Sequence, residues 1–231
     1  MKIYVVGAQE KKFFKFDESR EKYLINDKHE GENIDNWNNR FCELTGLYYL
    51  WKHCVDDILG LEHYRRSFKY NGHLLNEQDA EYILNDNDVI CHKAILRSYR
   101  LGRQLQSFIG RNDYHKIMVA LKTTYPDYYE TALKILDYKW HIQFNMLIAK
   151  KEFVNNYCEW LFGLLNPLVE FTGVEVFRRR SIGYISEILL NTLYFVHNNI
   201  KYKECEVELL DGYKGKGFSK FGTPLNFNIR K

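Results

Sequence analysis

Short apolar runs alternate along the chain with longer stretches in which apolar residues recur at helical spacing. Residues 2–6 form a β-branched and aromatic run that Gly7 closes, which predicts a buried first strand. Residues 41–52 carry apolar side chains at helical spacing and predict an amphipathic helix, for which Asn38 or Asn39 is available as the N-cap.

The alternation continues through the rest of the chain. Residues 57–62 have the length and character of a central strand. The further expected elements are a weak strand at 22–25, a helix at 76–85 that opens at an Asn cap, a strand at 88–91, two or three helices within 98–138 with breaks at 110–113 and 125–127, a strand at 144–148, a helix at 151–165 that Pro167 terminates, and a long helix at 183–196. Strands that alternate with helices indicate an α/β fold with a mostly parallel central sheet flanked by helices.

Composition narrows the class of protein. With 231 residues, 45% of them hydrophobic, the chain can bury one substantial core, so we expect one domain over residues 1–210 and a basic, Gly-rich tail at 211–231. A formal net charge of +3 is too balanced for a protein that mainly neutralises a nucleic-acid backbone. No apolar stretch approaches the roughly 18 residues that span a bilayer, and the first apolar run is too short for a signal peptide, so we expect a cytoplasmic protein.

The strand at 57–62 is followed by a polar run at its carboxyl end, where ligands collect in open α/β sheets. The run consists of His63, Tyr64, Arg65 and Arg66, and two guanidiniums with an imidazole are well suited to a diphosphate. Alternation along an extended chain would point His63 and Arg65 one way and Tyr64 and Arg66 the other. Ordinary salt bridges on a sheet rim remain the alternative.

A second basic cluster, Arg178 to Arg180, precedes the helix that carries Ser186 and Glu187. Basic side chains are unfavourable at a helix start unless an anion is shared there, so the cluster is either a solvated face or part of an anion site. Glu187 lies among apolar residues. Its carboxylate is therefore either a partner of the helix dipole or a general base with a shifted pKa.

The Asp-any-Asp spacing at residues 86–88 is one with which sugar-nucleotide transferases hold a divalent ion on the donor phosphates. Here it precedes its strand, at the wrong end of the sheet, and we interpret it as a turn. No residues are therefore assigned to a metal, and a requirement for Mn²⁺ or Mg²⁺ stays open. The five cysteines are scattered without a C-x-x-C pair, and no phosphate-binding loop or dinucleotide fingerprint is present, which argues against zinc, kinase, ATPase and dehydrogenase sites.

Six sequence blocks occur in one order over nearly the whole chain, at residues 33–34, 41–52, 58–66, 125–128, 145–162 and 182–187. The specific part is the combination of Phe-Cys-Glu-Leu-Thr at 41–45 with His-Tyr-Arg-Arg at 63–66. In this combination the chain resembles the bacterial capsular-polysaccharide glycosyltransferases catalogued as domain of unknown function 4422. At residues 7–11 it departs from the His-Lys pair that often ends the first strand in that family.

The resemblance implies a compact GT-A-like, Rossmann-like fold with a nucleoside-diphosphate sugar across the carboxyl ends of the strands. It implies a UDP-sugar donor, such as galactose in pyranose or furanose form, with arginines in the place of the metal-binding aspartates. It also implies a lipid-linked oligosaccharide acceptor of surface-polysaccharide synthesis at the inner membrane face. The tail at 211–231 either contacts anionic lipid there or is a plain chain end.

We hypothesise an inverting transfer in which Glu187 removes the proton of the acceptor hydroxyl. The candidates for the donor diphosphate are His63, Tyr64, Arg65, Arg66 and Arg180. Further candidates for donor or acceptor contacts are Glu43, Thr45, Asn145 and Ser186. The rival hypothesis is a non-catalytic scaffold subunit that binds sugar or nucleotide in a polysaccharide assembly complex.

Overall fold

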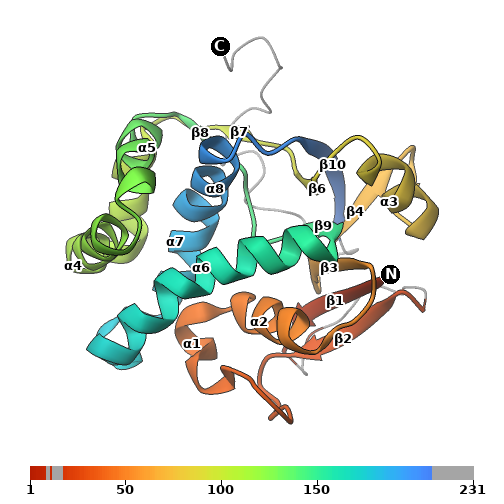
Figure 1. Cartoon of the computed structure of the whole chain (residues 1–231), viewed down its shortest axis with the longest axis horizontal. Coiled ribbons are helices and arrows are strands. Elements are labelled where there is room, and N and C mark those ends of the chain that lie inside the picture. The colour runs from red at the N-terminus through yellow and green to blue at the C-terminus, as the bar shows by residue number, and fades with distance from the viewer. Residues whose placement is uncertain (9–10, 12–17, 210–231) are drawn as a thin grey trace.

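The computed structural model describes residues 1–8, 11 and 18–209, and this part of the chain forms a mixed eight-stranded sheet with helices on both faces (Figure 1). Along the sheet the strands follow the order β2 (Arg20–Leu24), β1 (Lys2–Gly7), β3 (Ile58–His63), β9 (Leu147–Lys150), β6 (Val89–His92), β10 (Tyr202–Leu209), β4 (Arg66–Tyr70) and β5 (His73–Leu74). Two short strands, β7 (Ile95–Leu96) and β8 (Trp140–His141), pair separately.

The expectation of a mostly parallel sheet is wrong. β1 pairs parallel with β2 and β3, and β6 pairs parallel with β10, but β9 and β4 run against their neighbours. The reason is that β9 and β4 start at the edge where β3 and β6 end, and the hydrophobic pattern of a strand carries no information about its direction. Consequently the ends of β1, β3 and β6 and the starts of β4 and β9 meet at one edge, called here the site edge.

A further pairing between β3 and β4 closes part of the sheet on itself. The strands β3, β9, β6, β10 and β4 then form a continuous ring of pairings, while β1, β2 and β5 extend from it.

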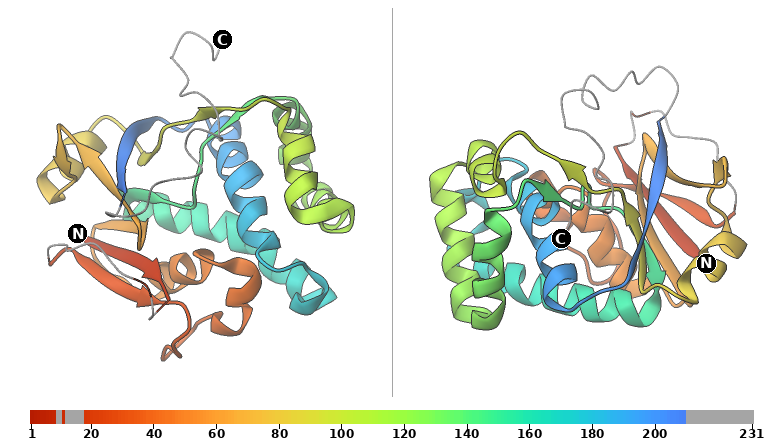
Figure 2. Two further views of the ribbon diagram at one scale, coloured as in Figure 1. Left: turned by 180° about the vertical axis from the view of Figure 1, so that it is seen from behind. Right: turned by 90° about the horizontal axis from the view of Figure 1, so that it is seen from above.

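Helices lie on both sides of the sheet and beside it. Their bounds are α1 (Asn38–Phe41), α2 (Leu44–His53), α3 (Glu77–Leu84), α4 (Leu101–Thr124), α5 (Pro126–Leu136), α6 (Lys151–Thr172), α7 (Ser181–Ile185) and α8 (Asn191–His197), with 3-10 turns at Asp35–Trp37 and Val174–Val176. A π-helix, Ser186–Leu190, joins α7 to α8 without a break. The helices α4 and α5 pack on α7 and α8, to the side of the sheet (Figure 2).

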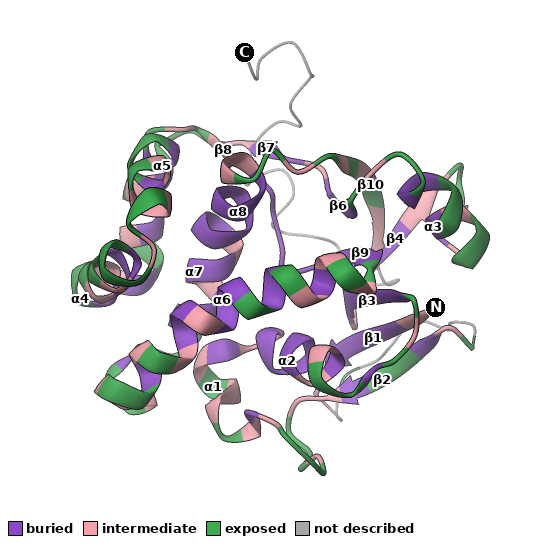
Figure 3. Cartoon of the chain, in the orientation of Figure 1, coloured by how far each residue is buried: buried purple, intermediate pink, exposed green. Residues whose placement is uncertain are grey.

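The alternating side chains of β3 show how the sheet divides the core. Leu59 and Leu61 pack with α2 and α6 in the larger hydrophobic cluster, whereas Ile58 belongs to a smaller cluster with α3. Gly46 allows α2 to approach the sheet, because a Cβ at this position would lie 2.7 Å from Cγ2 of Val6. In Figure 3 the inward sides of α2 and α6 are buried and the outer sides of α4 and α5 are exposed.

Most predicted helices are present, with corrected ends. The helix at 76–85 is α3, and Asn76 caps it, with Asn76 Oδ1 accepting from the N–H of Asp79 at 3.0 Å. The helix expected at 41–52 is interrupted: α1 ends at Phe41, Cys42 has φ 54°, and α2 starts at Leu44. The predicted N-cap at Asn38 or Asn39 is therefore wrong.

Of the helix breaks expected from the sequence, the one at Pro167 is absent and the others are present. α6 does not end at Pro167 but runs to Thr172, because Val169 beyond the proline is buried in the larger cluster and anchors the last turns. The helices predicted within 98–138 do show the expected break at Gly110, which has φ 80° inside α4 and kinks it. The second expected break falls between α4 and α5, at Tyr125.

The strand predictions are right for the apolar strands and incomplete elsewhere. The strand expected at 144–148 is β9, three residues later, since Phe144 has φ 68° and lies outside it. Neither β4 nor β10 was predicted. The tail expected at 211–231 lies outside the described residues. In the described part, none of the helices has the length and apolar character needed to cross a membrane.

Candidate functional site

The polar run after β3 forms a tight hairpin at the site edge. Tyr64 and Arg65 are the two turn residues, and His63 pairs directly with Arg66 across the hairpin. Directly opposed residues of antiparallel strands place their side chains on the same face. The expected separation of His63 from Arg66 is thus wrong, because the chain reverses where alternation along one extended strand was assumed.

A buried carboxylate fixes this hairpin. Glu62, which is completely buried, accepts hydrogen bonds from Arg20 Nε at 2.9 Å, Ser67 Oγ at 2.9 Å and the Phe68 N–H at 3.0 Å. A carboxylate with this many donors is well compensated for its burial. The hairpin that carries Arg65 and Arg66 is therefore a rigid platform.

His63 connects the hairpin to the start of α2. Its Nε2 lies 3.3 Å from Oε1 of Glu43, and its Nδ1 lies 3.4 Å from the backbone nitrogen of Arg65. Burial, together with the charges of Arg66 and Arg65, lowers the pKa of His63 although Glu43 opposes this shift. We therefore assign a neutral imidazole that donates from Nε2 to Glu43.

Glu43 itself stays ionised. Burial disfavours its charge, but the hydrogen bond from His63 and the nearby Arg180 outweigh burial and hold the pKa of Glu43 below its usual range.

Glu187 is the second carboxylate at the site edge. Its surroundings raise its pKa, whereas those of Glu43 lower the pKa of Glu43. It lies in the π-helix, whose wide turn is closed by the hydrogen bond from the Asn191 N–H to the Ser186 carbonyl. Burial and the charge of Glu43 raise the pKa of Glu187 to about 7, against the charges of Arg66 and Arg97 and a backbone hydrogen bond from Phe144. A carboxylate with a pKa near neutrality can accept a proton at physiological pH.

Basic and aromatic side chains surround the loop before β9. The guanidinium carbon of Arg66 lies 4.1 Å from the ring centroid of Phe144, and the ring centroids of Phe144 and His92 are 4.8 Å apart. Burial, above all other effects, lowers the pKa of His92 to about 4 and that of His141 to about 3. Arg97 is buried beside them and is close enough to influence Glu187.

Sequence reasoning missed His92, Arg97 and His141. His92 ends β6 as His63 ends β3, so its place at the end of a predicted strand was a usable signal. Arg97 follows β7 and His141 ends β8, and both strands have too few residues to give a pattern.

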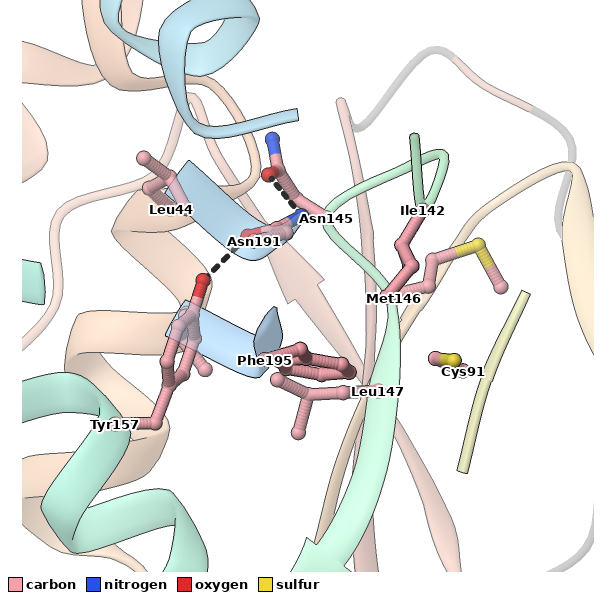
Figure 4. Close-up of a pocket in the computed structure, with 10 residues that line it drawn as sticks. Leu44, Cys91, Ile142, Asn145, Met146, Leu147, Tyr157, Asn191 and Phe195 are labelled. Carbon is pink, nitrogen blue, oxygen red and sulfur yellow. Dashed lines mark hydrogen bonds between the residues drawn. The ribbon is translucent and has the colours of Figure 1, made fainter. Parts of the chain in front are cut away.

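A buried polar network positions this loop. Asn191 Nδ2 donates to the Phe144 carbonyl at 2.9 Å and to Asn145 Oδ1 at 3.3 Å, while its Oδ1 accepts from Tyr157 and, at 3.2 Å, from Ser186 Oγ. Figure 4 shows Asn145, Tyr157 and Asn191 at a small cavity. The cavity is otherwise lined by apolar and sulfur-containing side chains, those of Leu44, Leu47, Cys91, Ile142, Met146, Leu147 and Phe195.

Three of the candidates for donor or acceptor contacts have internal partners. Asn145 Nδ2 donates to the Gly183 carbonyl at 3.2 Å, Ser186 is fully buried in the Asn191 network, and Thr45 Oγ1 donates to the Cys42 carbonyl at 2.8 Å. These side chains fix the backbone around Glu43 and Glu187. Of this group, Glu43 is the member that reaches the site edge.

The anion next to the basic cluster Arg178 to Arg180 is a carboxylate of the same chain. Asp113 of α4, which is buried, accepts from the Arg178 N–H at 2.9 Å and from Ser181 Oγ at 2.7 Å. Arg180 has φ 63° and its guanidinium carbon lies 5.2 Å from the ring centroid of Tyr184. This places Arg180 on the exposed rim, near Glu43.

The Asp-any-Asp spacing at 86–88 is a turn, as predicted. Asp88 precedes β6 and accepts from the Lys201 N–H at 2.8 Å, at the end of the sheet opposite the site edge. These aspartates therefore do not fit a metal on the donor phosphates. Within the described ranges, no group of three or more His, Cys, Asp and Glu side chains is arranged to bind a metal ion.

Comparison with known proteins agrees with this architecture. The chain is similar to the apo structure of WbbM, a bifunctional glycosyltransferase, with a TM-score of 0.75 and 20% identity. The similarity covers 91% of this chain and 45% of the WbbM chain, so the chain spans less than half of that protein. Among curated proteins, no sequence matches. The family described as domain of unknown function DUF4422 matches residues 2–199, and the chain belongs to this family.

Proposed function

We propose that the chain is a glycosyltransferase that moves a sugar, galactose in either ring form, from a UDP-sugar to a hydroxyl of a surface-polysaccharide acceptor. The observation that carries the proposal is the state of Glu187: a carboxylate with a pKa of about 7 lies beside Arg66 and Arg97 at the carboxyl edge of the sheet. The fold shared with WbbM supports the same class of reaction.

The basic groups of the site edge suit the donor diphosphate. Arg65 and Arg66 lie on the rigid hairpin, and we add Arg97, whose charge lowers the pKa of Glu187. Guanidiniums bind phosphate oxygens in a bidentate manner and stabilise the charge that develops on a leaving diphosphate. His63 and Tyr64 position the hairpin, and Arg180 contributes charge from the rim. No step of this mechanism is assigned to a metal.

The proposed reaction is a single displacement. The acceptor oxygen forms a bond to the anomeric carbon while its proton passes to Glu187, and the bond between the anomeric carbon and the diphosphate oxygen breaks. UDP leaves with the electron pair and the anomeric configuration inverts. The acceptor is proposed to be a lipid-linked oligosaccharide at the inner membrane face.

The test uses the purified chain with UDP, UDP-galactose and UDP-glucose, with and without manganese. We expect UDP to raise the melting temperature, since a ligand of the native state stabilises it, and we expect slow release of UDP from a UDP-sugar in the absence of acceptor. Stabilisation by UDP without any turnover would support the scaffold alternative. Neither stabilisation nor release, with any nucleoside diphosphate sugar, would refute both.

A further inference from the structure

An aromatic pair lies on the rim beside the proposed base. Phe108 of α4 is 42% exposed, and its ring centroid is 4.9 Å from that of Tyr184 of α7. Tyr184 precedes Glu187 by three residues in the continuous helix that runs from α7 into the π-helix. Residues at this spacing lie about one turn apart along a helix, so Tyr184 lies about one turn before the carboxylate.

A cation and an amide adjoin the aromatic pair. The exposed Arg180 stacks on Tyr184, as described above. Gln104 lies one turn before Phe108 on α4, on the same side of that helix. Its side chain is 7% exposed, and within the described residues its Oε1 has no hydrogen-bond partner.

The unpartnered amide oxygen points to a ligand. Buried side-chain oxygens in folded proteins nearly always accept a hydrogen bond, so Gln104 Oε1 is expected to have a donor when the site is occupied. A sugar combines the required features, because its hydroxyls donate hydrogen bonds and its C–H face packs on an aromatic ring. A lipid chain would satisfy the rings but leave the amide without a donor.

We propose that Phe108, Tyr184 and Gln104 form the acceptor subsite, which takes the terminal pyranose ring of the acceptor glycan and holds one of its hydroxyls toward Glu187. The ring of the sugar stacks on Phe108 and Tyr184, one hydroxyl donates to Gln104, and Arg180 donates to another. This subsite rests on the proposed transferase function and adds to it the chemical class of the acceptor.

The chain offers a matched set of variants for the test. Phe108→Ala removes the ring, Phe108→Leu retains apolar bulk without a ring, and Phe108→Tyr retains the ring. Phe171→Ala, which removes a 92% exposed phenylalanine from α6, is the control for losing an exposed aromatic away from the site.

The measurement is saturation-transfer NMR on the UDP-bound chain, titrated with methyl β-D-galactopyranoside and methyl β-D-glucopyranoside. We expect saturation of the sugar ring protons in the wild type, a loss of affinity of about 3- to 10-fold in Phe108→Ala and Phe108→Leu, and near wild-type affinity in Phe108→Tyr and Phe171→Ala. Melting temperatures check that each variant is folded.

Two results would overturn the subsite. One is equal affinity of Phe108→Ala, Phe108→Leu and Phe171→Ala for the glycosides, and the other is no saturation of either glycoside by the wild type. The failure of the transferase proposal is recognised separately, because it is measured by UDP stabilisation and UDP release, which do not require the acceptor.

Discussion

Glu43 and Glu187 are chemically identical side chains that the fold places in opposite protonation environments. Glu43 has His63 as a hydrogen-bond partner and keeps its charge, whereas Glu187 is desolvated and repelled by Glu43, with a pKa of about 7. Pairs of carboxylates with separated pKa values commonly divide the tasks of proton transfer and electrostatic positioning. On this basis we propose Glu187 as the proton acceptor and Glu43 as a fixed negative charge that raises the pKa of Glu187.

Replacing Glu187 tests the base directly. Glu187→Gln should lower the turnover number by about 10²- to 10⁴-fold, the usual contribution of general-base catalysis, and leave UDP binding unchanged. Glu170→Gln, at an exposed position of α6, is the matched control. Turnover of Glu187→Gln within about threefold of the wild type would show that another group accepts the proton.

The pH dependence tests the neighbours of Glu187. A base must be ionised to act, so kcat/KM should be full above the pKa of about 7 and fall as pH drops through it. Since Glu43 raises this pKa, Glu43→Gln should move the acidic limb of the kcat/KM profile, the pH range in which activity falls, to lower pH. Arg97 lowers the pKa, so Arg97→Gln should move the limb to higher pH. A limb that stays in place in both variants would assign it to another group.

At the residue scale, the sequence predicted charged groups and not their contacts. Arg66 and His63 were chosen as candidates because the end of an apolar strand is a recognisable place for a ligand. Glu187 was chosen because a carboxylate among apolar residues stands out. Asn145 and Ser186 were polar residues near the same blocks, but their side chains point into the Asn191 network. The direction of a short polar side chain depends on tertiary contacts, which the sequence does not display.

At the element scale, the β3–β4 hairpin depends on one buried ion pair. Arg20 and Glu62 are both buried, and Arg20 Nη2 also donates to the Leu75 carbonyl at 2.8 Å. Arg20 therefore joins β2 and β3 to the residues that follow β5. Removing one member of such a pair leaves a buried charge, which is more costly than removing both.

We expect Arg20→Met to lower the free energy of unfolding by about 3–5 kcal/mol. The control is Lys2→Met, which removes a cation from the partly exposed pair with Glu21 and should cost at most about 1 kcal/mol. Urea denaturation of both variants measures the difference. Similar losses in the two variants would mean that the Glu62 carboxylate is satisfied by Ser67 and Phe68 alone.

Elements with an apolar period were predictable, and elements defined by pairing were not. α3 and β3 have clear patterns and were found close to their true positions. β10 has the sequence YKECEVEL, with Cys205 as its buried residue, and becomes a strand through pairing with β6 and β4. Cys42, with φ 54°, divides a helix whose apolar spacing continues across the break.

At the scale of the whole molecule, buried histidines link stability to pH. His92 and His141 have pKa values of about 4 and about 3 in the fold, against an ordinary value of about 6.5 in an unfolded chain. The unfolded chain therefore binds protons that the native protein does not between these values. The contribution of these two histidines to the free energy of unfolding is therefore fully present above pH 6.5 and is lost as pH falls. The raised pKa of Glu187 opposes part of this loss.

Each of the two histidines should contribute a loss of up to about 1.4 kcal/mol per pH unit between pH 6 and pH 4. Urea midpoints at several pH values measure the slope. His141→Gln should reduce the slope, whereas His73→Gln, at an exposed position of β5, should not. An unchanged slope in His141→Gln would mean that His141 is already protonated or becomes hydrated before unfolding.

The α/β class and the helices on both faces were predictable from the alternation of patterns, and the direction of the strands was not. β9 follows a helical hairpin and enters the sheet from the site edge, so it runs against β3 and β6. The direction of β9 is decided by the side from which α4 and α5 return the chain to the sheet, which is a property of the assembled molecule.

The ring of strands described above also limits how a donor can enter. Each of its five strands pairs with the next, and the circuit closes at the pair of His63 and Arg66, of which Arg66 is proposed to bind the diphosphate. A sliding strand would have to break pairings around the entire circuit, so the floor of the site should stay still during the catalytic cycle. Movement that admits substrates and releases UDP should come from the helices α4 and α7, which carry Phe108 and Tyr184.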